Sequence, residues 1–147
     1  MKFKKIIAVA ALVSACGVCA VAGCSSGDAK TVEGDYHYVT EYGTYGVKVS
    51  VEVNNDKIKK VTILDSDYTL TTSAEYGFAD SVKWDKGVNA LLDTYTDRSV
   101  SSVLEQKVTV GADSVPTAVD NSAFVVSGAT QSSGRLLLAV QDALKKL

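Results

Sequence analysis

A run of alternating valines constrains the fold of this 147-residue chain more than any other feature. Every second residue from Val47 to Val53 is valine and the residues between are polar, a period of two that predicts a strand with one buried face. Residues 54–56 are Asn-Asn-Asp, a composition typical of a tight turn. A second apolar segment follows over 58–63, and its Lys59-Lys60 pair interrupts the alternation as a β-bulge does. The chain therefore contains an antiparallel hairpin.

The rest of the chain predicts a third strand and several helices. Tyrosines alternate with polar residues from Tyr36 to Tyr45, which predicts a strand with turns at Gly43 and Gly46. These tyrosines suit packing in a half-buried strand, and stacking on a flavin or a carbohydrate is the alternative. Downstream, the pattern predicts one or two helices over 74–96, and if there are two they divide at 85–87. A short helix over 100–104, a short strand over 107–111 and a loop over 113–120 follow. The chain then continues with a core strand over 123–126 and an amphipathic helix over 131–147. The predicted fold class is α+β, a small antiparallel sheet packed by helices.

The N-terminus has the layout of a secretory signal. Lysines within residues 2–5 precede a small and apolar run over 6–22, and the run ends in Val-Ala-Gly followed by Cys24. This ending resembles the bacterial lipobox, in which the cysteine is acylated. A transmembrane anchor is the alternative, although about 17 apolar residues are short for a span. We expect a lipoprotein signal peptide over 1–23, a lipidated tether over 24–32 and a domain over 33–147, anchored through a palmitate-type lipid on the extracytoplasmic face of the cell membrane.

Charge and cysteine content exclude several classes of function. Without residues 1–23 the chain has 12 basic and 17 acidic residues, a net charge of −5 that argues against nucleic-acid binding. Cys16 and Cys19 form a CxxC pair, but both lie in the signal and leave with it, and lipid occupies Cys24. With His37 as the only histidine, we expect no metal site of the usual ligands, and the absence of a GxSxG motif argues against a hydrolase. No catalytic residue is therefore predicted.

Hydroxyl and glycine residues gather where the last helix is expected to begin. Residues 127–130 are Ser-Gly-Ala-Thr, and Gln-Ser-Ser-Gly follows. The first turn of a helix presents unpaired N–H groups and the positive end of the helix dipole, which together suit a phosphate. The alternative is that Ser127, Thr130 and Ser132 serve only as helix N-caps.

Residues 127–133, the amphipathic helix after them and the hairpin before them together resemble the FMN-binding domain family. That family includes the peripheral flavin subunits of sodium-pumping NADH:quinone reductase and many extracytoplasmic redox lipoproteins. The resemblance covers roughly 32–147 and implies FMN as cofactor, joined through its phosphate to Thr130 by a flavin transferase. The residues implied to bind the cofactor are Ser127, Gly128, Ala129, Thr130, Ser132 and Ser133. The first three shape the turn, and the two later serines offer donors to the phosphate.

One position departs from the family pattern and leaves two functions open. The family usually has an aspartate three residues before the serine, which the transferase is thought to need, and this chain has Phe124 there. The nearest upstream acid is Asp120. The first function is a membrane-anchored electron carrier that relays electrons to or from a membrane redox partner rather than converting a substrate. The second is a non-catalytic extracytoplasmic binding module of the same fold that lacks covalent flavin.

Overall fold

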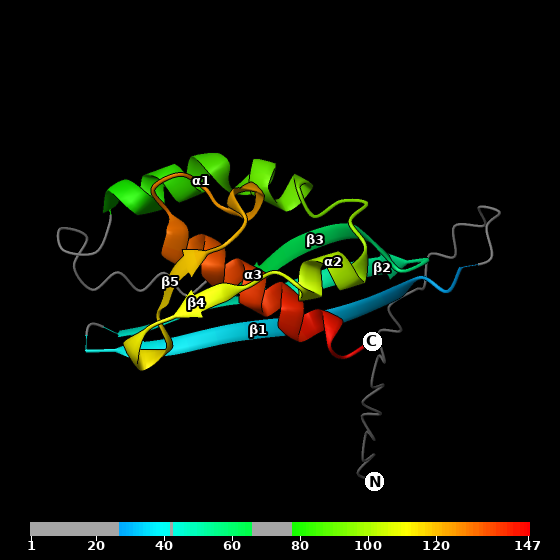
Figure 1. Ribbon diagram of the computed structural model, residues 1–147, viewed down its shortest axis with the longest axis horizontal. Helices are drawn as coiled ribbons and strands as arrows, with labels where there is room; N and C mark the ends of the chain where they lie inside the picture. The colour runs from blue at the N-terminus through cyan, green and yellow to red at the C-terminus, as the bar shows by residue number, and fades with distance from the viewer. Residues whose placement is uncertain (1–26, 42, 66–77) are drawn as a thin grey trace, which may run out of the picture.

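The computed structural model describes residues 27–41, 43–65 and 78–147 (Figure 1). The predictions for the signal peptide and for Cys24 lie outside these residues. The elements are β1 (Lys30–Thr40), β2 (Gly43–Asn54), β3 (Lys57–Asp65), α1 (Phe78–Asp93), α2 (Val100–Leu104), β4 (Val108–Val110), the 3₁₀ turn η1 (Ala112–Ser114), β5 (Pro116–Val119), the 3₁₀ turn η2 (Ser122–Phe124) and α3 (Thr130–Leu144). The α+β class is confirmed. Of the helices in the described ranges, none has the length and apolar character needed to cross a bilayer.

The main sheet is antiparallel, with the strand order β1-β2-β3. From Tyr45 to Val53, alternate residues of β2 are buried, as the period of two predicted. Asn55 and Asp56 have φ values of 52° and 59°, the left-handed pair that a two-residue hairpin turn of type I′ requires. The register with β3 shifts beside Val53 so that Lys59 has no partner on β2, which confirms the expected bulge.

α3 lies over the buried face of this sheet and runs antiparallel to β1 (Figure 1). Gly34 marks the closest approach, because a Cβ there would come within 2.3 Å of backbone atoms of Ala139 and Ala143. The core forms where the two layers meet. Its members include Val47, Val49, Val51, Val53, Ile58, Val61, Leu136, Leu137, Val140 and Leu144.

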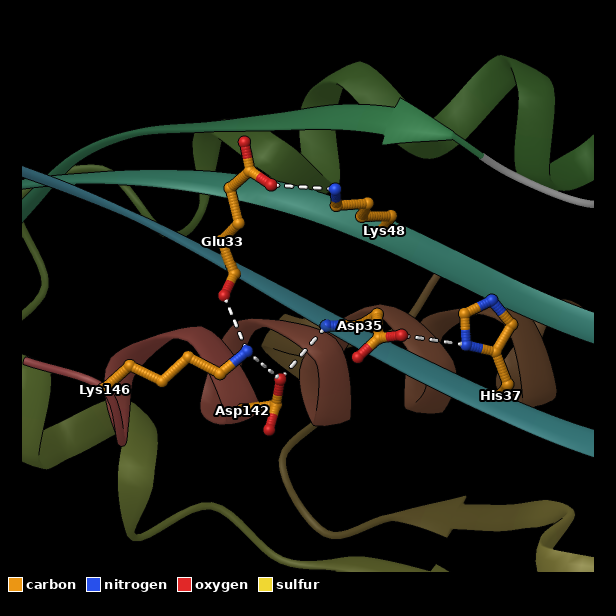
Figure 2. A network of polar contacts seen from close by, with 6 residues as sticks. All are labelled: Glu33, Asp35, His37, Lys48, Asp142 and Lys146. Atoms are coloured by element: carbon orange, nitrogen blue, oxygen red, sulfur yellow. Dashed lines mark hydrogen bonds and ion pairs between the residues drawn. The ribbon is translucent and has the colours of Figure 1, made fainter.

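A polar network fastens the end of α3 to the free edge of β1 (Figure 2). The Asp142 carboxylate accepts the N–H of Asp35 at 3.1 Å, and Lys146 pairs with that carboxylate at 2.8 Å. Lys146 also donates to the carbonyl oxygen of Glu33 at 2.8 Å. The network continues through the pairs His37–Asp35 and Lys48–Glu33. Asp142 in α3 and Lys146 just after the helix thereby occupy backbone groups of an edge strand that could otherwise pair with another chain.

A second layer covers another side of α3. β4 and β5 form a two-stranded antiparallel sheet, and Pro116 packs where Gly134 leaves room, since a Cβ on Gly134 would lie 2.7 Å from Pro116 Cβ. The buried Gln141 donates from Nε2 to the carbonyl oxygens of Val103 at 2.9 Å and Gln106 at 2.8 Å. Gln141 thereby links α3 to the segment at the end of α2, where the carbonyl oxygen of Val103 also accepts the N–H of Gln106 at 3.2 Å.

Two segments were predicted wrongly because long-range packing decides their conformation. The expected loop over 113–120 contains β5, which pairs with β4 and is held by the contact of Pro116 with α3. The expected core strand over 123–126 begins instead with η2. There the buried ring of Phe124 packs against Tyr95, with ring centres 5.0 Å apart, and the side chain of Asn121 accepts the N–H of Ala123 at 3.0 Å.

Two further glycines lie inside regular elements. Gly46 does not form the predicted turn but lies inside β2, where the ring of His37 covers it and a Cβ would lie 1.9 Å from that ring. Of the one or two helices predicted over 74–96, the structure has one, because α1 runs unbroken from Phe78 to Asp93. Gly87 instead lets Val126 approach, since a Cβ would meet Val126 Cγ1 at 2.6 Å.

Candidate functional site

The start of α3 carries no side-chain cap among the described residues. Ala129 is the N-cap residue, with φ −131° and ψ 44°, and it has no side chain that could accept a backbone N–H. The first intrahelical bond joins the N–H of Ser133 to the carbonyl oxygen of Ala129 at 3.0 Å. The N–H groups of Thr130, Gln131 and Ser132 therefore precede the helical ladder. The alternative in which hydroxyls cap this helix is wrong.

Ser133 holds the turn that precedes α3. Its fully buried hydroxyl donates to the carbonyl oxygen of Ala129 at 2.8 Å and accepts the N–H of Val126 at 2.9 Å. Sequence reasoning expected this hydroxyl to donate to a phosphate. Because its proton already goes to Ala129, the contacts give Ser133 a structural role within the turn.

The other predicted site residues come together at one end of α3. Ser127 and Gly128 are exposed, and Gly128 has a φ of 78°, which a glycine adopts without strain. Thr130 and Ser132 are half-buried, so each side chain still reaches the surface. Ala129 is buried and anchors the turn from below. The predicted cluster therefore exists, with Thr130 as the first residue of the helix.

An open hollow of about 270 Å³ adjoins the turn on the side of α1. Small and apolar residues dominate its wall. The lining residues are Gly87, Ala90, Leu91, Thr94, Ala123, Val125, Val126 and Ser127. Ser127 belongs both to the turn before α3 and to the wall of the hollow, so the hollow adjoins the segment that leads into the helix start.

Sequence reasoning missed Arg135, which lies one turn into α3. Among residues 27–41, 43–64 and 86–147, for which side-chain burial is described, it is the only buried charged side chain, with 3% of its surface exposed. Its guanidinium lies 5.7 Å from the ring centre of Tyr38 and 5.9 Å from that of Tyr45. A charged residue within an apolar helical stripe was the available signal.

The tyrosines of β1 and β2 serve packing rather than an exposed stacking surface. The rings of Tyr38 and Tyr45 stack with centres 5.3 Å apart. Tyr38 exposes 5% of its surface and Tyr45 exposes 8%. Burial raises the pKa of the Tyr38 hydroxyl. The packing interpretation of these two residues is thus confirmed.

Phe124 stands where the family pattern has an aspartate, and its side chain is fully buried. The ring packs against Tyr95, with centres 5.0 Å apart, and the guanidinium of Arg98 lies 4.6 Å from its centre. Asp120, the nearest upstream acid, is exposed. This position therefore contributes to the core and presents no charge at the surface.

The model of the FMN-binding domain matches residues 42–145 of the chain. The chain belongs to the FMN-binding domain family. The match includes β2, the hairpin turn and the whole of α3, so the resemblance seen in the sequence is confirmed. A search of curated proteins found no significant match.

The site suits the cofactor of the FMN-binding domain family. Three N–H groups and the hydroxyls of Thr130 and Ser132 are donors of the kind that bind a phosphate. The adjoining hollow has the small apolar wall that a flat ring system needs. FMN is the cofactor that family membership assigns to this chain.

Proposed function

We propose that this protein is an electron carrier, anchored by lipid on the extracytoplasmic face of the cell membrane, that holds FMN at the start of α3. One observation carries the proposal: an uncapped helix start, with Thr130 as its first residue, opens beside an apolar hollow. When bound, FMN supplies transfer of one or two electrons. Its partners are a flavin transferase and a membrane redox donor or acceptor.

Residues of this chain bind and orient the cofactor. The N–H groups of Thr130, Gln131 and Ser132 and the dipole of α3 stabilise the negative phosphate. Ser133 fixes the turn, and the wall of the hollow excludes water from one side of the ring. Because the site is built from donors and apolar surface, it positions a redox group rather than providing an acid or a base.

Thr130 is the proposed point of covalent attachment. In this reaction the hydroxyl oxygen of Thr130 attacks the flavin-side phosphorus of a flavin dinucleotide, the pyrophosphate P–O bond breaks, a nucleoside monophosphate leaves and the hydroxyl proton is released. The net addition to the protein is one FMN less one water. A covalent bond keeps the cofactor on a protein that faces the outside of the cell, where a dissociated flavin is lost. Thr130 is half-buried rather than enclosed, as a residue that a transferase modifies would need to be.

Phe124 favours a second candidate, a binding module of the same fold without covalent flavin. The buried ring offers a transferase no carboxylate at the position where the family usually has one. In this candidate, the same helix start binds a phosphate-bearing ligand reversibly.

Intact-mass measurement separates the two candidates. The full-length chain is co-expressed with an extracytoplasmic flavin transferase, and Thr130→Ala is prepared in parallel with Thr109→Ala, a control at an exposed threonine of β4 outside the site. We expect the wild type and Thr109→Ala to gain one FMN less one water and to fluoresce in a denaturing gel, and Thr130→Ala to do neither. A folded wild type with no added mass rules out covalent attachment and leaves the binding module.

A further inference from the structure

Arg135 places a positive charge close to the start of α3. The residue lies five positions after Thr130, on the side of the helix that faces β1 and β2. The aromatic faces of Tyr38 and Tyr45 lie next to its guanidinium. Aromatic faces attract cations, and the attraction grows when water is excluded, so these rings offset part of the cost of burying the charge.

The guanidinium contacts one residue of the candidate site directly. Arg135 Nη2 donates a hydrogen bond to the hydroxyl oxygen of Ser132 at 3.0 Å. A hydroxyl that accepts from a cation keeps its own proton for another acceptor. Ser132 also contributes an N–H group that precedes the helical ladder, so both donors of this residue are available at the same helix start.

We propose that Arg135 is a positioning residue for the FMN phosphate, which orients the Ser132 hydroxyl as a donor and adds a positive charge to the dipole of α3. The inference rests on the proposed location of the phosphate at this helix start. Arg135 does not touch the ligand, because its side chain is buried, and it acts through Ser132 and through its field. The consequence is selectivity: the site prefers FMN to riboflavin, which has the same ring system but no phosphate.

Comparison of these two flavins isolates the contribution of the phosphate. The full mature chain is purified without cofactor, and the dissociation constants of FMN and riboflavin are measured by fluorescence titration. For Arg135→Gln we expect FMN binding to weaken by about 10-fold or more, since a hydrogen bond supported by a charge is lost. Riboflavin binding stays unchanged.

Two further variants keep the test decisive if Arg135→Gln fails to fold. Ser132→Ala removes the contact while leaving the buried charge, and we expect a smaller loss of FMN binding with no change for riboflavin. Arg135→Lys keeps the charge but lacks the planar guanidinium group, so this variant should retain part of the preference for FMN over riboflavin. Lys59→Gln serves as the matched control, because it removes one positive charge from an exposed ion pair with Asp97. Folding of each variant is checked by thermal unfolding.

The outcomes distinguish this inference from the proposed function. If the wild type binds FMN no better than riboflavin, the phosphate is not bound at the start of α3, and both proposals fail. If the wild type prefers FMN and the Arg135 and Ser132 variants keep the full preference, only the role of Arg135 is overturned. Equal weakening of both flavins would show that Arg135 supports the fold alone.

Discussion

Two serines near the start of α3 have different surroundings and therefore different roles. The hydroxyl of the buried Ser133 both donates and accepts a hydrogen bond, while Ser127 is exposed and its hydroxyl has no hydrogen-bond partner among the described residues. The two serines stand six positions apart and look equivalent in the sequence. Their different surroundings give them different effects when they are substituted.

We expect Ser133→Ala to destabilise the protein by about 1–3 kcal/mol, because the change leaves the N–H of Val126 without its acceptor. Ser127→Ala is the control and should change the free energy of unfolding by less than about 0.5 kcal/mol. Urea unfolding followed by circular dichroism measures both. Equal stability of the two variants would contradict the structural role of Ser133.

Phe124 leads to a second prediction at this scale. Phe124→Asp restores the residue type of the family pattern, yet we expect it to cost at least about 3 kcal/mol and to lower flavin attachment, because it buries a carboxylate beside Tyr95. Phe124→Leu should cost about 1 kcal/mol. Thermal unfolding and intact mass report the two effects. A stable Phe124→Asp protein with increased flavin content would show that this segment can rearrange.

At the scale of the elements, local periodicity made some parts of the fold predictable. The β2–β3 hairpin, its bulge at Lys59 and the last helix follow from patterns within a few residues of one another. β5 and η2 were missed because Pro116 and Phe124 take their conformations from distant partners on α3 and near the end of α1. Arg135 was overlooked for the same reason, since the tyrosines beside it lie almost a hundred residues earlier.

The contact between α3 and β1 has a testable dependence on pH. A hydrogen bond from Lys146 holds the pKa of Asp142 below its usual value. The ionised carboxylate therefore stabilises the folded state above the unfolded pKa of about 3.9, and this contribution is lost as the pH falls through the lower folded value.

We expect Asp142→Asn to be less stable than the wild type at pH 6, with a difference that shrinks below about pH 4. The effect is small because 40% of the Asp142 side chain is exposed. Urea unfolding between pH 2.5 and pH 6 tests the expectation. Parallel stability curves for the two proteins would show that this carboxylate contributes no pH dependence.

For the whole molecule, the direction of α3 determines how far the site lies from the beginning of β1, where the proposed tether would join the domain. Lys146 lies beside Glu33 near the beginning of β1, whereas the helix starts at Thr130 towards the opposite end (Figure 1). With a rise of about 1.5 Å per residue, Thr130 lies about 24 Å from Lys146 along the helix axis. Lys30 lies about 10 Å from Glu33 along β1, in the direction away from Thr130.

We expect an FMN held at Thr130 to stand about 30 Å from a bilayer that anchors the chain through Cys24. In vesicles with nitroxide-labelled headgroups, the flavin fluorescence of the lipidated protein should be quenched weakly. A dye on an Asn55→Cys variant, in the β2–β3 turn at the tethered end, should be quenched strongly. Equal quenching at both positions would mean that the domain lies flat on the membrane.

The lengthwise arrangement of α3 on β1 separates the two ends of the domain. Under the proposed function, a flavin at Thr130 stands far from the lipid phase, and electron tunnelling weakens steeply with distance. We therefore expect the redox partner to be a protein that projects from the membrane or approaches from the medium. The proposed tether would then set the height at which the two proteins meet.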